Sequence, residues 1–209
     1  MYRIYWRRQT GAFAPQVVLE EAGVPYEIVP IDTKTGEHRQ PAYLKINPQG
    51  RVPALQLPDG SIMTESAAMV LYLADRHGKG KLAPGPDDPD RPRFLRWLFF
   101  MACNLYEADL RAYYPARYST DGDAAAGIKA AAVRDMDEQW DMVEAALDPG
   151  PYLLGERESV LDPYMLMLAS WHPDMSQLLA GLPRLKRACD LTLARPAIAR
   201  VWAEHEAAA

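Results

Sequence analysis

The sequence has very little cysteine, and the cysteines it has form no motif. Only Cys103 and Cys189 occur among 209 residues, and each lies in an apolar pattern typical of a helix. Two distant cysteines build neither a disulfide framework nor a metal site. We therefore expect two buried helix residues, no bound metal, and a protein of a reducing compartment.

Long apolar runs and a strong net charge are also absent. Charged residues interrupt the apolar stretches well before they reach membrane-spanning length, and residues 1–6 are too short and too mixed for a signal peptide. The net charge of −5 disfavours a nucleic-acid partner. With 49% hydrophobic residues the composition is that of a globular protein. We expect a cytoplasmic protein with no membrane partner.

The N-terminal part of the chain shows two kinds of apolar periodicity. Residues 2–6 alternate with the period of a strand, and residues 12–22 carry a helical stripe that ends at Gly23-Val24-Pro25. Residues 26–31 are rich in β-branched side chains and predict a second strand. This β-α-β order favours a parallel strand pair with a right-handed crossover.

Turn signals divide the next segment into shorter elements. Residues 53–57 and 61–64 flank Pro58-Asp59-Gly60, which indicates a hairpin. A helical turn is expected at 41–46 and a helix at 65–77. The economical arrangement is one mixed four-stranded sheet in an α/β domain. We assign residues 1–78 to this domain, residues 79–91 to a Gly/Pro/Asp-rich linker, and residues 92–209 to an all-helical domain.

The helical part has one sharp local motif. Helices are expected at 93–106, 124–147, 159–168 and 198–206 from their apolar spacing. Ser159 and Asp162 stand at the spacing of a capping box, in which each end of the motif satisfies a free N–H group of the first helical turn. We interpret this pair as structural.

Two dipeptides carry the case for a binding site. Pro53 opens a strand, and a cis Val52-Pro53 bond would leave the Val52 backbone free to hold an extended peptide. Glu65 and Ser66 stand at a helix start, where free N–H groups attract an anion. The Ser66 hydroxyl suits a carboxylate and the Glu65 carboxylate suits an ammonium group. Together they predict a site for a small peptide with an amino-acid head group.

The residues around these dipeptides resemble the cytosolic glutathione transferase family. The resemblance is carried by the run from Asn47 to Leu55, by Thr64-Glu65-Ser66, and by Leu71-Tyr72-Leu73-Ala74. It implies a thioredoxin-like N-terminal domain, a helical C-terminal domain, and a homodimer. It also implies glutathione as co-substrate, with no other cofactor. The implied glutathione contacts are Gln9, His38, Arg51, Val52, Pro53, Glu65 and Ser66.

The group that would activate the glutathione thiol is open at this point. The family places a Tyr, Ser or Cys at the end of the first strand or in the following loop, because a donor near the sulfur stabilises the thiolate. Here Gly11-Ala12 align with the Cys-Ser pair of beta-type members, and no serine precedes Arg51. Tyr5 and Thr10 remain as catalytic candidates, with Gln9 as a weaker donor.

The acceptor site is expected between the domains, and a small hydrophobic electrophile is its expected ligand. The run 111–118 is dense in aromatic and guanidinium groups, which suit a flat anionic or electron-poor molecule. The resemblance implies conjugation of glutathione to such an electrophile. Alternatives are a glutathione-dependent isomerase, dehalogenase or lyase, a non-catalytic binding protein, and a dimerisation module. The candidate wall residues are Phe13, Trp97, Asn104, Tyr106, Arg111, Tyr114 and Trp171.

Overall fold

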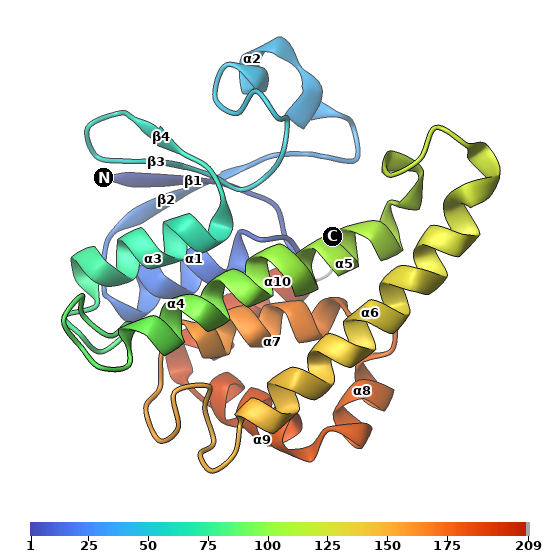
Figure 1. Cartoon of the computed structure of the whole chain (residues 1–209). Coiled ribbons are helices and arrows are strands. Elements are labelled where there is room, and N and C mark those ends of the chain that lie inside the picture. The colour runs from blue at the N-terminus through green and yellow to red at the C-terminus, as the bar shows by residue number, and fades with distance from the viewer. Residues whose placement is uncertain (208–209) are drawn as a thin grey trace. The chain divides into compact units, whose positions relative to one another are not determined.

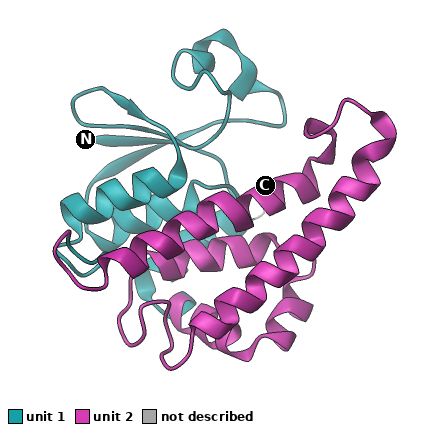
Figure 2. Ribbon diagram, in the orientation of Figure 1, with its two compact units in different colours: residues 1–85, 193–209 teal, residues 86–192 magenta. Residues whose placement is uncertain are grey.

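The computed structural model describes residues 1–207 and divides into two compact units. Unit 1 contains Met1–Gly85 together with the segment from Leu193 onward, and unit 2 contains Pro86–Thr192. Figure 2 shows the two units in different colours. Each unit has its own buried core and is described here separately.

Unit 1 is built on a four-stranded mixed sheet (Figure 1). β1 (Tyr2–Trp6) pairs in parallel with β2 (Tyr26–Pro30) and antiparallel with β3 (Ala54–Gln56), which pairs antiparallel with β4 (Ile62–Met63). The resulting order is β2-β1-β3-β4. The structure therefore confirms the predicted parallel opening, the hairpin and the mixed sheet.

Strand alternation decides which helices cover which face of this sheet. Tyr2 and Ile4 of β1 are buried on one face, and α1 (Phe13–Glu21) packs against α3 (Ser66–His77). Tyr5 points to the opposite face, where its ring meets Tyr43 of α2 (Pro41–Leu44) at 6.0 Å between centroids. The candidate glutathione residues precede α2, follow it, or begin α3.

The C-terminal helix α10 (Pro196–Glu206) belongs to unit 1, whereas the sequence analysis placed residues up to 209 in the helical domain. α10 packs against α1, and its apolar face buries Ile198 and Val201. Arg195 and Glu21 form a 2.5 Å ion pair at the start of α10. The apolar spacing of this segment reveals an amphipathic helix but not the surface that it covers.

Unit 2 is all-helical. Its first long helix differs from the expected helix at 93–106, because Met101–Leu105 form one turn of π-helix, η2, between α4 and α5. Such turns widen the helix locally and often mark functional sites. The helix at 159–168 begins two residues later than expected and ends at Trp171. The elements of unit 2 are α4 (Arg91–Phe100), α5 (Tyr106–Tyr113), η3 (Pro115–Arg117), η4 (Gly122–Ala124), α6 (Ala125–Ala146), α7 (Leu161–Trp171), α8 (Met175–Gly181) and α9 (Pro183–Leu193).

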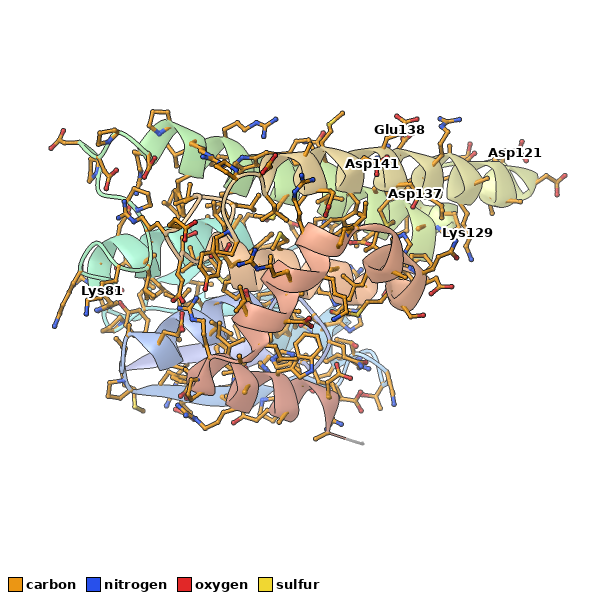
Figure 3. The ribbon with its side chains drawn as sticks, turned by 90° about the horizontal axis from the view of Figure 1, so that it is seen from below. Lys81, Asp121, Lys129, Asp137, Glu138 and Asp141 are labelled. Atoms are coloured by element: carbon orange, nitrogen blue, oxygen red, sulfur yellow. The ribbon has the colours of Figure 1, made fainter. Side chains whose placement is uncertain are left out.

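The core of unit 2 forms where amphipathic helices face each other. α6 buries Met136 and Trp140, while Asp137, Glu138 and Asp141 stand on its exposed side (Figure 3). Full burial of a large apolar side chain contributes about 1.5–3 kcal/mol, so this stripe fixes the orientation of the helix. The long helix predicted at 124–147 is confirmed.

The predicted capping box is present at the start of α7. The N–H of Ser159 donates to Asp162 Oδ2 at 2.8 Å, and Leu161 N–H donates to Ser159 Oγ at 3.2 Å. Asp162 Oδ1 also accepts from Leu153 N–H at 3.3 Å, which ties the preceding loop to the helix. All three groups are buried, so the box satisfies donors that water does not reach.

The prediction for the cysteines was wrong for one of the two. Cys189 is buried in α9, whereas Cys103 is exposed in the π-helical turn. The wider turn changes which side chains face inward, so the helical period assumed from the sequence fails there. No helix within residues 1–207 combines the length and the apolar character needed to cross a bilayer.

Candidate functional site

The loop before β3 is fixed by two buried side chains. Tyr43 Oη and Asn47 Nδ2 both donate to the carbonyl oxygen of Arg51, at 2.7 and 2.8 Å. Asn47 Oδ1 also accepts from Gln49 N–H at 3.1 Å. Tyr43 and Asn47 are each 3% exposed, so these bonds are protected from water. They set the course of the chain immediately before Val52.

Gly50 in this loop occupies a position where a side chain would be sterically and conformationally unfavourable. Gly50 has φ +58°, and a Cβ atom there would lie 2.8 Å from the carbonyl oxygen of His38. The loop therefore lies directly against η1 (Glu37–Arg39), where Arg39 also donates to the Gln49 carbonyl at 3.0 Å. This close approach brings the candidate His38 beside the same loop.

The main-chain groups of Val52 form an edge beside β3. The Val52-Pro53 bond is cis, and Pro53 is buried at the entrance to β3. Within residues 1–207, neither the N–H nor the C=O of Val52 has a hydrogen-bond partner. A peptide amide in an extended ligand offers the complementary donor and acceptor.

The N-terminus of α3 supplies the second part of the site. Glu65 is exposed and has φ +67° and ψ +105°, a conformation that a non-glycine residue adopts at a cost of roughly 1–3 kcal/mol. Ser66, at 9% exposure, begins the helix directly after it. Such local strain clusters at ligand sites, because the surrounding structure holds a side chain where a ligand needs it.

A side-chain contact joins the two parts. Gln49 Nε2 donates to Glu65 Oε1 at 3.4 Å, so the loop before Val52 reaches the α3 N-terminus. The first N–H groups of a helix attract anions, while Glu65 adds an acceptor for a cation. The arrangement therefore suits a peptide that carries a carboxylate and an ammonium group at one end.

The candidate thiol-activating groups lie in β1 and in the segment between β1 and α1. The Thr10 hydroxyl donates to the Arg7 carbonyl at 2.7 Å and accepts from Ala12 N–H at 3.3 Å, at the start of α1. Gln9 is exposed and has φ +52°. Tyr5 lies inside the sheet, with its ring against Tyr43. Thr10 therefore lies in the loop, Gln9 lies at the apex of the loop, and Tyr5 lies in the strand.

The candidate acceptor residues occupy different environments. Phe13 in unit 1 is 2% exposed and packs edge-on against Trp202 and His205 of α10. In unit 2, Trp97 is 4% exposed under the guanidinium of Arg96. Both rings therefore leave little surface for a ligand.

The other wall candidates lie on and around α5. Asn104 is exposed, and its amide donates to the Phe100 carbonyl at 3.2 Å. The Tyr106 ring meets the Trp171 ring at 5.1 Å, and Arg117 stacks over the exposed Tyr114 ring at 3.8 Å. The structure thus groups Tyr106 with Trp171, and Tyr114 with Arg117.

α5 also contains two buried polar atoms that lack partners. The Nε of Arg111 and the Oδ1 of Asp109 have no hydrogen-bond partner among the described residues. Burial raises the pKa of Asp109 to about 8, and it is 4% exposed. The sequence analysis missed Asp109, because a lone aspartate in a helix carries no signal of its burial. It missed Tyr43 and Asn47 as anchors for the same reason.

The fold and this site together define a class of protein. A thioredoxin-like domain with a mixed four-stranded sheet is followed by a helical region, as in glutathione transferases of known structure. The family model for the glutathione S-transferase N-terminal domain matches residues 13–76. The chain belongs to the glutathione S-transferase family.

Individual relatives show how much of the chain the similarity covers. It is 31% identical to glutathione S-transferase F9 of Arabidopsis thaliana over 70% of this chain and 69% of that one. It is 28% identical to a maleylacetoacetate isomerase of Pseudomonas aeruginosa over 94% and 92%. A Sulfitobacter glutathione transferase homologue, solved with bound glutathione, superposes with a TM-score of 0.89 at 30% identity over 98% of each chain.

Within residues 1–207 no group of three or more His, Cys, Asp or Glu side chains is arranged to hold a metal ion.

Proposed function

We propose that this protein is an enzyme that transfers the thiolate of glutathione to a small hydrophobic electrophile. The observation that carries the proposal is the link between the free Val52 backbone edge and the strained Glu65 at the α3 N-terminus, made by the Gln49–Glu65 contact. A tripeptide with an extended middle and a charged head group fits these features. The structure of a 30% identical relative holds glutathione, which supports this choice of ligand.

The residues take roles that follow from their chemistry. The Val52 backbone pairs with the cysteinyl amide. Ser66 and the α3 N-terminus hold the γ-glutamyl carboxylate, and Glu65 accepts from its ammonium group. His38 and Arg51 lie on the side of the glycine carboxylate, and Gln9 lines the thiol. In the reaction the sulfur forms a bond to the electrophilic carbon, and the leaving group departs with its electron pair.

Binding and chemistry are tested separately. Calorimetry should show binding of both glutathione and S-methylglutathione, because the two share every contact outside the sulfur. Only glutathione should give an ultraviolet thiolate signal at neutral pH and turnover of a chlorodinitrobenzene-type acceptor. Binding without thiolate or turnover would make this a non-catalytic binding protein. Absence of binding would favour a dimerisation module and refute the proposal.

A glutathione-dependent isomerase is the second candidate. It is favoured by the isomerase relative that aligns with 94% of this chain. It is also favoured by Arg111, whose buried Nε has no hydrogen-bond partner within residues 1–207 and suits an anionic substrate. In this reaction glutathione adds to a double bond, the new single bond rotates, and glutathione leaves unchanged. An anionic cis-alkene converted to its trans isomer with no loss of glutathione would support this candidate over conjugation.

We also propose that the protein is a homodimer, on the strength of its family resemblance. Size-exclusion chromatography with light scattering at micromolar concentration should give twice the mass of the chain. A monomeric mass would contradict this.

A further inference from the structure

A buried polar cluster joins the C-terminal helix to the segment between β1 and α1. His205 of α10 is 3% exposed. Its Nδ1 lies 3.1 Å from the backbone nitrogen of Gln9, and its Nε2 lies 3.0 Å from Gln16 Oε1 in α1. Trp6 Nε1, at the end of β1, lies 2.8 Å from the same Gln16 oxygen and 2.9 Å from His205 Nε2. One side chain thus contacts the loop, the strand end and the helix, although about 190 residues separate it from them.

Two fixed N–H donors face the ring nitrogens of His205, and a neutral imidazole can accept at only one of them. Gln9 N–H faces Nδ1 at 3.1 Å, whereas Trp6 Nε1–H faces both Nε2 at 2.9 Å and Gln16 Oε1 at 2.8 Å. Because Trp6 has Gln16 Oε1 as an alternative acceptor, we assign Nδ1 as the unprotonated acceptor of the Gln9 N–H. The imidazole proton then sits on Nε2 and is donated to Gln16 Oε1, which also accepts from Trp6. Gln16 Nε2 donates to Glu204 Oε2 at 2.7 Å and to Tyr26 Oη at 3.2 Å, which fixes the amide in this orientation. The bond from Gln9 N–H requires a neutral imidazole, because a protonated ring carries a proton on Nδ1 and cannot accept there.

Burial keeps the imidazole neutral. It lowers the pKa of His205 to about 4, and the nearby Arg8 acts in the same direction. Edge-on contacts with the Trp6 ring at 5.0 Å and the Phe13 ring at 5.3 Å enclose it. His205 is therefore a fixed hydrogen-bond acceptor across the physiological pH range.

The loop bound by His205 Nδ1 has an energetically unfavourable backbone conformation at Gln9. Gln9 has φ +52°, in the left-handed region that non-glycine residues rarely adopt. Thr10 follows directly, and its hydroxyl bonds with Arg7 and Ala12 depend on the course of the same turn. The Gln9 N–H in this turn donates to the His205 side chain at 3.1 Å.

We propose that His205 is a positioning residue for thiol activation: its Nδ1 fixes the Gln9 backbone, so that the loop presents its donors to the sulfur of bound glutathione. This inference rests on the proposed function. The hydrogen bonds and ring contacts of His205 join it to Trp6, Gln9, Phe13 and Gln16 rather than to the residues that we assign to the tripeptide. Its role is therefore in forming the thiolate rather than in holding the tripeptide.

The test compares two variants of this one residue. His205→Phe retains the ring and its aromatic contacts but removes both nitrogens. His205→Asn places an amide oxygen at the position of Nδ1 and restores the acceptor. In His205→Phe we expect about tenfold less thiolate at neutral pH and about tenfold lower kcat, which corresponds to a change of about one pKa unit in the bound thiol. The dissociation constant of glutathione should change by less than about threefold, and His205→Asn should recover most of the loss.

A control and a wild-type measurement complete the experiment. Trp202→Phe alters the ring contact with Phe13 and leaves the polar cluster intact, so its thiolate titration should match the wild type. NMR of ¹⁵N-histidine-labelled wild type should show His205 as the neutral Nε2–H tautomer, which remains testable if a variant does not fold. An Nδ1–H tautomer, or equal thiolate in wild type and His205→Phe, overturns the positioning role alone. A wild type that binds no glutathione overturns the proposed function as well.

Discussion

The glutathione side and the α5 side of this protein present their polar groups in contrasting ways. In unit 1 the candidate groups are main-chain edges and helix-end N–H groups, held in place by buried side chains such as Tyr43 and Asn47. In unit 2 they are side chains on α5, where Asp109 Oδ1 and Arg111 Nε are buried without a hydrogen-bond partner in the described part of the chain. Main-chain groups fixed by a network are suited to one ligand. Unpaired side chains next to aromatic rings are suited to several acceptors.

The contrast predicts that α5 is less stable than it would be with a neutral side chain at position 109. The Asp109 carboxyl titrates near 3.8 in the unfolded chain and near 8 in the folded protein. Between these values the folded state holds a proton that the unfolded state lacks. The free energy of unfolding therefore falls as the pH rises through this window, by an amount on the order of 2–5 kcal/mol.

Asp109→Asn removes this titration and keeps the shape of the protonated acid. We expect a small increase in Tm over wild type at pH 5, near the low end of this window, and a larger increase at pH 9, measured by calorimetry. Asp141→Asn on the exposed side of α6 is the matched control, and it should give no pH-dependent difference (Figure 3). Equal Tm values for Asp109→Asn and wild type at pH 9 would show that Asp109 is ionised and paired. The difference that we draw between the paired groups of unit 1 and the unpaired groups of α5 would then be wrong.

The second prediction concerns the fixed side of the comparison. Ser66→Ala removes a hydroxyl that we assign to the γ-glutamyl carboxylate. A hydrogen bond to a charged group contributes about 1.5–3 kcal/mol, so the dissociation constant of glutathione should rise about 10- to 100-fold by calorimetry. Ser61→Ala is the matched control, because Ser61 is exposed in the β3–β4 turn and bonds to Asp59. If both variants bind glutathione equally well, the assignment of the α3 N-terminus is wrong.

Much of unit 1 was predictable because its determinants are local. The alternation of residues 2–6 gave β1, and Pro58-Asp59-Gly60 gave the hairpin. The Glu65-Ser66 pair marked the start of α3. Each signal depends on neighbouring residues, which the sequence presents directly.

The features that could not be predicted depend on distant partners. His205 lies in an ordinary amphipathic helix, and its contact with Gln9 exists only because α10 packs on α1. The burial of Asp109 and the π-helical turn before it also follow from packing rather than from local pattern. Helical periodicity identifies an apolar face, but not which surface covers that face.

The smallest expected effect distinguishes the two hydroxyl candidates for thiol activation. Thr10 stands at the start of α1, where the positive end of the helix dipole also favours a thiolate. Tyr5 stands within β1, and its ring packs against Tyr43 rather than at the start of α1. We therefore expect Thr10→Val to reduce the bound thiolate and kcat by about tenfold, which is the effect of about 1.4 kcal/mol.

Tyr5→Phe is the matched comparison, since it also removes one hydroxyl and keeps the remaining shape. It should change kcat by less than about threefold, because its ring packing against Tyr43 is retained and is worth only about 0.5–1.5 kcal/mol. Glutathione affinity should remain near that of wild type in both variants, so a change in kcat reports thiol activation. A larger loss in Tyr5→Phe than in Thr10→Val would move the activating group from the loop to the strand. It would also remove the reason to regard the loop held by His205 as the place where the thiolate forms.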